Sequence, residues 1–117
     1  MRLEDLVQAL LTFDTLAARQ WVADAARAGI EWTRMPKPQF DTAEAEAVAA
    51  SVADLLAQRN GETPPEWTRE VGASPTTVML VKAIATMPNL RVLCETEGPE
   101  PMRRRNILAP PEFLTIA

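Results

Sequence analysis

Apolar positions in the first 60 residues repeat with the spacing of amphipathic helices. Residues 3–11 predict a first short helix. In residues 15–28 one stripe has members at i, i+3 and i+4 spacing: Ala18, Trp21, Val22, Ala25 and Ala28. In residues 42–59 the buried positions are predicted to be Val48, Val52, Leu55 and Leu56. The first half of the chain is therefore predicted to form three helices.

Short polar residues and glycines mark the expected ends of these helices. Asp14 is a predicted N-cap, because its carboxylate can accept hydrogen bonds from free backbone N–H groups at a helix start. Gly29 predicts the end of the second helix. Asp41 and Glu44 have the spacing of a capping box at the start of the third helix, and Gly61 predicts its end.

Prolines and glycines divide the second half into shorter segments. A capping-box pattern at residues 63–66 predicts a short helix that continues to Val71. Residues 76–87 are apolar nearly all round, which predicts a central, buried helix. Asn89 is expected to cap a further helix over residues 90–97.

No segment shows the strict alternation of a half-buried strand, so we predict an all-α fold. The expected architecture is a compact single-domain helical bundle of about five to six helices over residues 1–117, a usual length for one domain. N-terminal helices occupy residues 1–60. The C-terminal part, residues 62–117, ends in a proline-rich tail at 99–117 with at most two short helical turns.

Composition places the chain among ordinary globular proteins. It is 47% hydrophobic with a formal net charge of -4, which argues against disorder. Its one cysteine, Cys94, cannot close an intramolecular disulfide, and this fits a reducing compartment. The acidic N-terminus lacks a signal-peptide pattern, and no apolar run reaches the length of a membrane span. We expect a cytoplasmic protein without membrane contact.

The residue types favour a non-enzymatic protein, for which we predict no catalytic, cofactor-binding or metal-ligating residue and no cofactor. The chain has no histidine, so zinc binding and acid–base chemistry lack their usual side chain. Glu95 and Glu97 should raise the pKa of the Cys94 thiol. An enzyme using a carboxylate pair or Lys82, which interrupts the apolar segment 76–87, is the weaker hypothesis, because such a lysine commonly reaches the surface or pairs with an acid.

Arg103, Arg104 and Arg105 form the one local basic cluster. They could contact phosphate or an acidic partner, or they could be paired internally, because residues 91–105 carry a net charge of only +1. Arginine is enriched at protein interfaces, which favours a protein partner. The tryptophans, Trp21, Trp32 and Trp67, are predicted to be core or half-buried anchors.

A family resemblance rests on four segments of the second half. They are Pro65-x-Trp67, Leu90-Arg91, Arg104-Arg105-Asn106-Ile107 and Phe113-Leu114. In this order, residues 62–117 resemble the C-terminal half of bacterial antitoxin-like regulators that accompany nucleotidyltransferase-like toxins. The whole chain also resembles small uncharacterised bacterial proteins of similar length. The first resemblance implies a partner-binding module whose contact residues would be Arg103, Arg104, Arg105, Asn106, Trp67 and Phe113.

Two functions therefore stay open. The first is a protein–protein interaction module, for example an antitoxin-like one, that binds a protein partner such as a toxin through its C-terminal region. The alternative is a small nucleic-acid-binding transcriptional regulator that uses Arg19 with the basic cluster. The second helix offers only Arg19 and Arg27 as basic groups, fewer than a recognition helix normally presents. Alanine-rich helix faces and three tryptophans also predict self-association as a homodimer.

Overall fold

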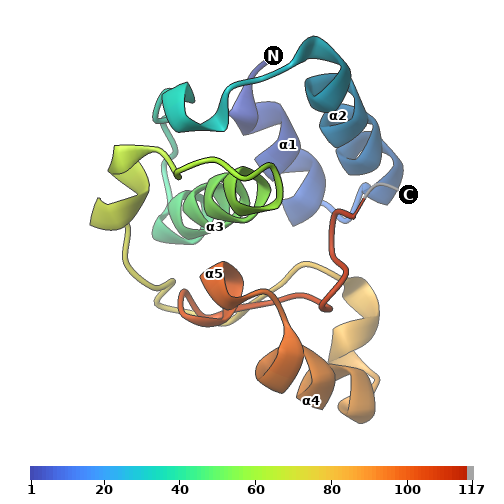
Figure 1. The fold of residues 1–117 in the computed structure, drawn as a ribbon. Helices are drawn as coiled ribbons and strands as arrows, with labels where there is room; N and C mark the ends of the chain where they lie inside the picture. The colour runs from blue at the N-terminus through green and yellow to red at the C-terminus, as the bar shows by residue number, and fades with distance from the viewer. Residues whose placement is uncertain (116–117) are drawn as a thin grey trace.

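The computed structural model describes residues 1–115 as an all-α fold (Figure 1). The α-helices are α1 (Leu3–Leu11), α2 (Thr15–Ala28), α3 (Ala43–Arg59), α4 (Pro88–Glu97) and α5 (Glu100–Arg103). Three 3₁₀ turns are η1 (Trp32–Arg34), η2 (Glu66–Glu70) and η3 (Lys82–Ala85). The only strands among these residues are β1 (Val78–Met79) and β2 (Ile107–Leu108).

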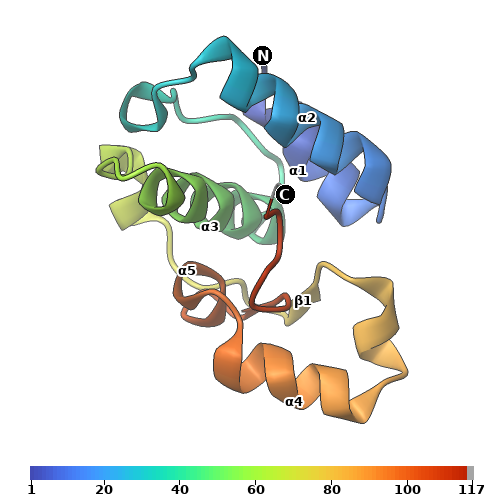
Figure 2. The same cartoon turned by 45° about the vertical axis from the view of Figure 1, so that its right-hand side comes forward.

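The helices form layers around α3. Figure 2 shows α1 and α2 side by side on one side of α3, with α4, α5 and β1 on the other. The α1 and α2 boundaries agree with the predicted ones. The Asp14 carboxylate accepts a hydrogen bond from the backbone N–H of Ala17 at 3.1 Å, which confirms the predicted N-cap of α2.

The central helix of the molecule is α3, and it is covered on nearly all sides. Every residue from 47 to 57 is buried. Its neighbours are α1, η1, η2 and α5. Alanine makes this possible, since small side chains let other segments approach the helix from several directions. The N-cap of α3 is Thr42, whose hydroxyl accepts a hydrogen bond from Ala45 N–H, and not the predicted Asp41.

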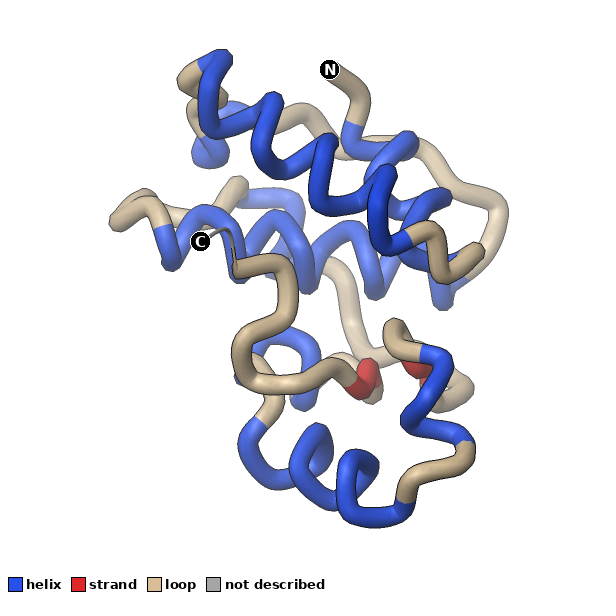
Figure 3. The backbone as a smooth tube through the Cα atoms, turned by 90° about the vertical axis from the view of Figure 1, so that its right-hand side faces the viewer, coloured by secondary structure: helices blue, strands red, loops and turns tan. Residues whose placement is uncertain are grey.

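The prediction of a buried central helix over residues 76–87 is wrong. This segment forms β1 and η3, and only Leu80 and Ile84 within it are fully buried. β1 pairs in parallel with β2, with Val78 opposite Ile107 and Met79 opposite Leu108 (red in Figure 3). Along this chain Val78 and Leu80 pack against one core cluster, whereas Met79, Val81 and Ile84 pack against or belong to a second one. Packing on both sides requires a continuous apolar run, and the sequence of a buried helix looks the same.

Two smaller expectations also differ from the structure. Residues 66–70 form the 3₁₀ turn η2 instead of an α-helix that continues to Val71. Helix α4 begins at Pro88, with Met87 at the N-cap position in place of the predicted Asn89. Proline is favoured in a first helical turn because its missing N–H has no partner there, and this sets the earlier start.

The C-terminal residues pack onto the domain. Met102, Ile107 and Ala109 are each 0% exposed and belong to the same core cluster as Leu3, Leu6 and Val48. Residue 98 must be glycine for the chain to pass there, because an added Cβ would lie 2.5 Å from the Ala109 carbonyl oxygen. One hydrophobic core therefore includes residues from both ends of the chain.

Candidate functional site

The arginine cluster surrounds a buried carboxylate on α3. Asp54 is only 1% exposed, and its Oδ2 atom lies 2.8 Å from Nη1 of Arg105. Arg104 also donates a hydrogen bond to the same oxygen through Nη2. The second carboxylate oxygen, Oδ1, is buried without a protein hydrogen-bond partner. Two arginines of the predicted partner-binding set are thus held by one internal acid.

Arg105 joins the end of α5 to α3 and to the region of η2. Its guanidinium donates to the carbonyl oxygens of Thr68 at 3.0 Å and Pro101 at 3.2 Å, and to that of Val71 at 3.4 Å. The side chain is 3% exposed, so it is not accessible to a partner. Arg105 is therefore paired inside the protein, which is one of the two alternatives that the sequence allowed for the basic cluster.

The other two arginines of the cluster remain at the surface. The Arg104 side chain is 49% exposed and forms a second ion pair with Glu100 at 3.5 Å. Arg103 is exposed, and its Nε donates to the Gly98 carbonyl at 2.6 Å. The exposed positive charge is therefore smaller than the run of three arginines predicts.

Asn106 shapes the turn before β2. Its backbone is left-handed, with φ of 64°, a conformation that asparagine tolerates better than most residues. Its side chain donates to the Ser74 carbonyl at 3.2 Å and accepts from the Thr77 hydroxyl at 3.0 Å. These contacts hold residues 74–77 beside the turn. They give Asn106 a structural role that needs no binding partner.

The tryptophans are the core and half-buried anchors that the sequence predicts. Trp32 is 3% exposed, and its ring centroid lies 5.9 Å from that of Trp21. Trp67 is half-buried and donates through Nε1 to the Met35 carbonyl at 2.8 Å. Trp67 therefore has an internal structural contact of its own.

Phe113 belongs to a segment, residues 110–115, that we call the C-terminal strap. Arg59, at the end of α3, holds the strap by donating to the carbonyl oxygens of Phe113 and Pro111. Phe113 is half-buried against the core. Neither Arg59 nor this contact was predicted, since nothing local in the sequence joins residue 59 to residues 111–113.

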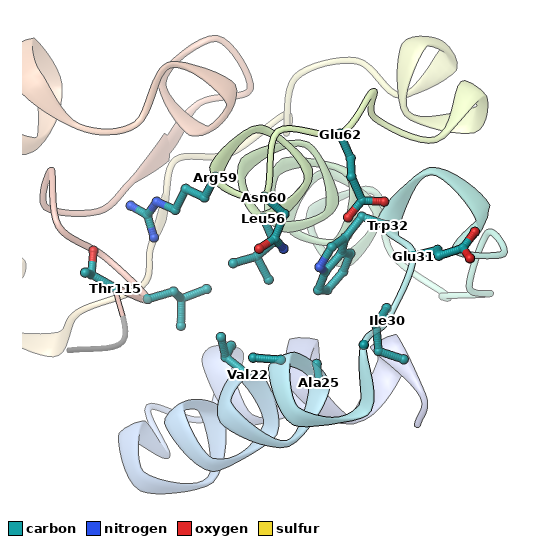
Figure 4. Close-up of a pocket in the computed structure, with 13 residues that line it drawn as sticks. Val22, Ala25, Ile30, Glu31, Trp32, Leu56, Arg59, Asn60, Glu62 and Thr115 are labelled. Atoms are coloured by element: carbon teal, nitrogen blue, oxygen red, sulfur yellow. The ribbon is translucent and has the colours of Figure 1, made fainter.

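The strap lies between two pockets. One, the Arg59 pocket, has a volume of about 580 Å³ and lies where α2 and α3 end, as Figure 4 shows. The other, the Phe13 pocket, has a volume of about 240 Å³. Its larger non-proline apolar lining residues are Leu10, Phe13, Leu80, Val81, Phe113 and Leu114, and its charged ones are Asp14, Arg19 and Glu112. Leu114 and Thr115 line both pockets.

Helices α1, α2 and α3 end in the same backbone motif. In each, a left-handed residue donates to the carbonyl three positions earlier, and the next residue donates to the carbonyl five positions earlier. The left-handed residues are Phe13, Gly29 and Gly61, with φ of 58°, 67° and 69°. Phe13 thus occupies a position that glycine normally fills, and its side chain is 43% exposed.

Cys94 and Lys82 are the two reactive side chains that the sequence singles out. Cys94 is 0% exposed; burial raises the pKa of its thiol, and the carboxylates of Glu112 and Glu95 raise it further. Lys82 is exposed at the start of η3. Among residues 1–115, no group of three His, Cys, Asp or Glu side chains is placed to hold a metal ion.

None of the helices in residues 1–115 has both the length and the apolar composition that crossing a membrane requires. Comparisons with protein-family models, curated proteins and solved structures find no match to this chain.

Proposed function

We propose that this domain is a non-enzymatic protein–protein interaction module that binds a partner through the Phe13 pocket and the neighbouring Leu16 side chain. Leu16 is 79% exposed, the largest exposure among the large apolar residues described. Phe113 supplies the C-terminal side of this surface. Aromatic and apolar side chains that meet at a pocket are the usual anchors of a protein interface.

The observation that carries the proposal is the identity of residue 13. A left-handed backbone costs a non-glycine residue roughly 1–2 kcal/mol, and α2 and α3 avoid this cost with Gly29 and Gly61. At residue 13 the chain instead has a large aromatic side chain, 43% of which remains in solvent. A strained residue that exposes apolar surface beside a pocket is typical of a binding position.

The charge distribution supports a protein partner over nucleic acid. Arg104 and Arg105 are neutralised by Asp54 and Glu100, so they offer little to phosphate groups. The Phe13 pocket carries two acids, Asp14 and Glu112, against one base, Arg19. The resemblance of residues 62–117 to antitoxin-like regulators makes a toxin-type protein the first partner class to test.

The test compares Phe13→Gly with the unaltered chain in affinity purification from the host cell. Phe13→Gly should leave the free energy of unfolding unchanged within about 1 kcal/mol, because relief of the left-handed backbone offsets the lost side-chain contacts. The same variant should lose the co-purifying partner. Val92→Ser is the matched control, since Val92 is 56% exposed on α4 and lines neither pocket.

Retention of every partner by Phe13→Gly would contradict the proposal. Size-exclusion chromatography of both variants at high concentration separates a second copy of this chain from a different protein as the partner. A gel shift at low salt gives the nucleic-acid alternative its own measurement, because phosphate contacts strengthen as salt falls.

A further inference from the structure

The Arg59 pocket has a charged group at each end of an apolar middle. Val22, Leu56 and Trp32 lie in the middle of the view in Figure 4, with Arg59 and Thr115 on one side and Glu31 and Glu62 on the other. Its volume of about 580 Å³ falls within the usual range for small-molecule sites. The lining therefore distinguishes the two ends of an elongated ligand.

Arg59 has hydrogen-bonding capacity left over. Its guanidinium has five N–H donors, and two hydrogen bonds to the C-terminal strap are present. Within residues 1–115 it makes no ion pair. Partial burial lowers the pKa of Arg59 from its ordinary value, although the group stays cationic near neutral pH. A ligand carboxylate would compensate for the water that this cation has lost.

The opposite end of the pocket favours a cation. Glu62 is half-buried and makes no ion pair within the described residues, whereas Glu31 pairs with Arg34. The C-terminal ends of α2 and α3 also border the pocket through Gly29 and Asn60. Carbonyl groups at helix C-termini carry partial negative charge, which adds to the attraction for an ammonium group.

We propose that the Arg59 pocket binds a small elongated zwitterion, with its carboxylate at Arg59, its ammonium group at Glu62 and an apolar chain between them. This site is separate from the proposed partner surface. The two pockets share only Leu114 and Thr115, so failure of one proposal leaves the other standing.

The experiment is isothermal titration calorimetry of the full chain with three matched probes. They are 8-aminooctanoate, octanoate and octylamine, which share one apolar chain and differ in their charged ends. The zwitterion should bind about tenfold more tightly than either singly charged probe, because each end adds a charge-assisted contact. Equal affinity for all three probes, or no binding of any at millimolar concentration, would overturn the proposal.

Two variants locate the site. Glu62→Gln keeps the size of the side chain and should reduce the affinity for 8-aminooctanoate about tenfold without changing that for octanoate. Ala26→Phe places a large side chain at the exposed edge of the pocket and should abolish binding of all three probes. A thermal melt of each variant establishes that it is folded, and unchanged binding by either folded variant would refute the assigned position.

Discussion

The two halves of the chain are held in different ways. Residues 3–59 include three regular α-helices, each closed by the same backbone motif, and α2 and α3 also have side-chain caps at their starts. Residues 62–115 form short helices, 3₁₀ turns and a two-residue strand pair, which are joined by side chains to distant backbone carbonyls. Local sequence patterns are therefore informative about the first half and much less so about the second.

Asp54 is the point at which the two kinds of structure meet. It lies on α3, the most regular helix, and its partners Arg104 and Arg105 come from the irregular half. A buried ion pair contributes little compared with an apolar replacement, but removal of one partner leaves an uncompensated charge in the interior.

Arg105→Ala should have the largest effect, a loss of about 3–5 kcal/mol in the free energy of unfolding, because Asp54 would be left buried with its main partner gone. Urea denaturation measures this loss. Arg104→Ala is the matched control on the same acid; the Arg104 side chain is 49% exposed, so its removal should cost about 1 kcal/mol. Equal losses in the two variants would show that burial does not decide the strength of this pair.

Ala53→Leu tests whether the regular half depends on close packing around α3. Ala53 is 0% exposed, so the larger side chain should destabilise the domain by about 1–3 kcal/mol through overpacking. The exposed Ala43 on the same helix gives the control, Ala43→Leu, which should change stability by less than about 0.5 kcal/mol. Circular dichroism measures the melting temperature of both variants. Equal melting temperatures would mean that the surroundings of Ala53 are loosely packed.

Asn106 allows backbone and side-chain effects in the irregular half to be separated. Asn106→Ala should lose about 2 kcal/mol, since it removes two hydrogen bonds and places alanine in a left-handed conformation. Asn106→Gly should lose only about 1 kcal/mol, because glycine adopts this conformation freely. If chemical denaturation found the glycine variant to be the less stable one, the left-handed backbone would not be the source of the difference.

The smallest effect should come from a helix cap. Asp14→Ala should cost about 1 kcal/mol by removing the hydrogen bond to Ala17 N–H. Asp41→Ala is the control, because Thr42 and not Asp41 caps α3, and it should leave the melting temperature unchanged. A comparable loss for Asp41→Ala would mean that Asp41 shares the capping of α3.

The parts of the fold that sequence reasoning predicts are those with local causes. Asp14, Gly29 and the apolar stripes fix the first three helices because each acts within one or two turns. The helix prediction for residues 76–87 is wrong because part of this segment pairs in parallel with residues 107–108. Such long-range pairing leaves no local signal, and the apolar run that it requires resembles that of a buried helix.

The candidate site was predicted only in part. Phe113 does line a pocket, whereas the burial of Arg105 depends on an acid 51 positions away. One signal was present, since Asp54 is the only charged residue in the otherwise uncharged run 47–57 and so needed an opposite charge. Phe13 carried no local signal, because only the cap geometry shows that it occupies a glycine position.

The all-round burial of α3 has a consequence for the order in which the chain folds. Its neighbours include α1, which precedes it in the chain, and α5, which follows it, so the burial of this helix is complete only when both are present. A chain emerging from the ribosome holds α3 with one side uncovered until residues 100–109 follow it. We therefore expect the burial of α3 to be complete only after residues 100–109 have been added.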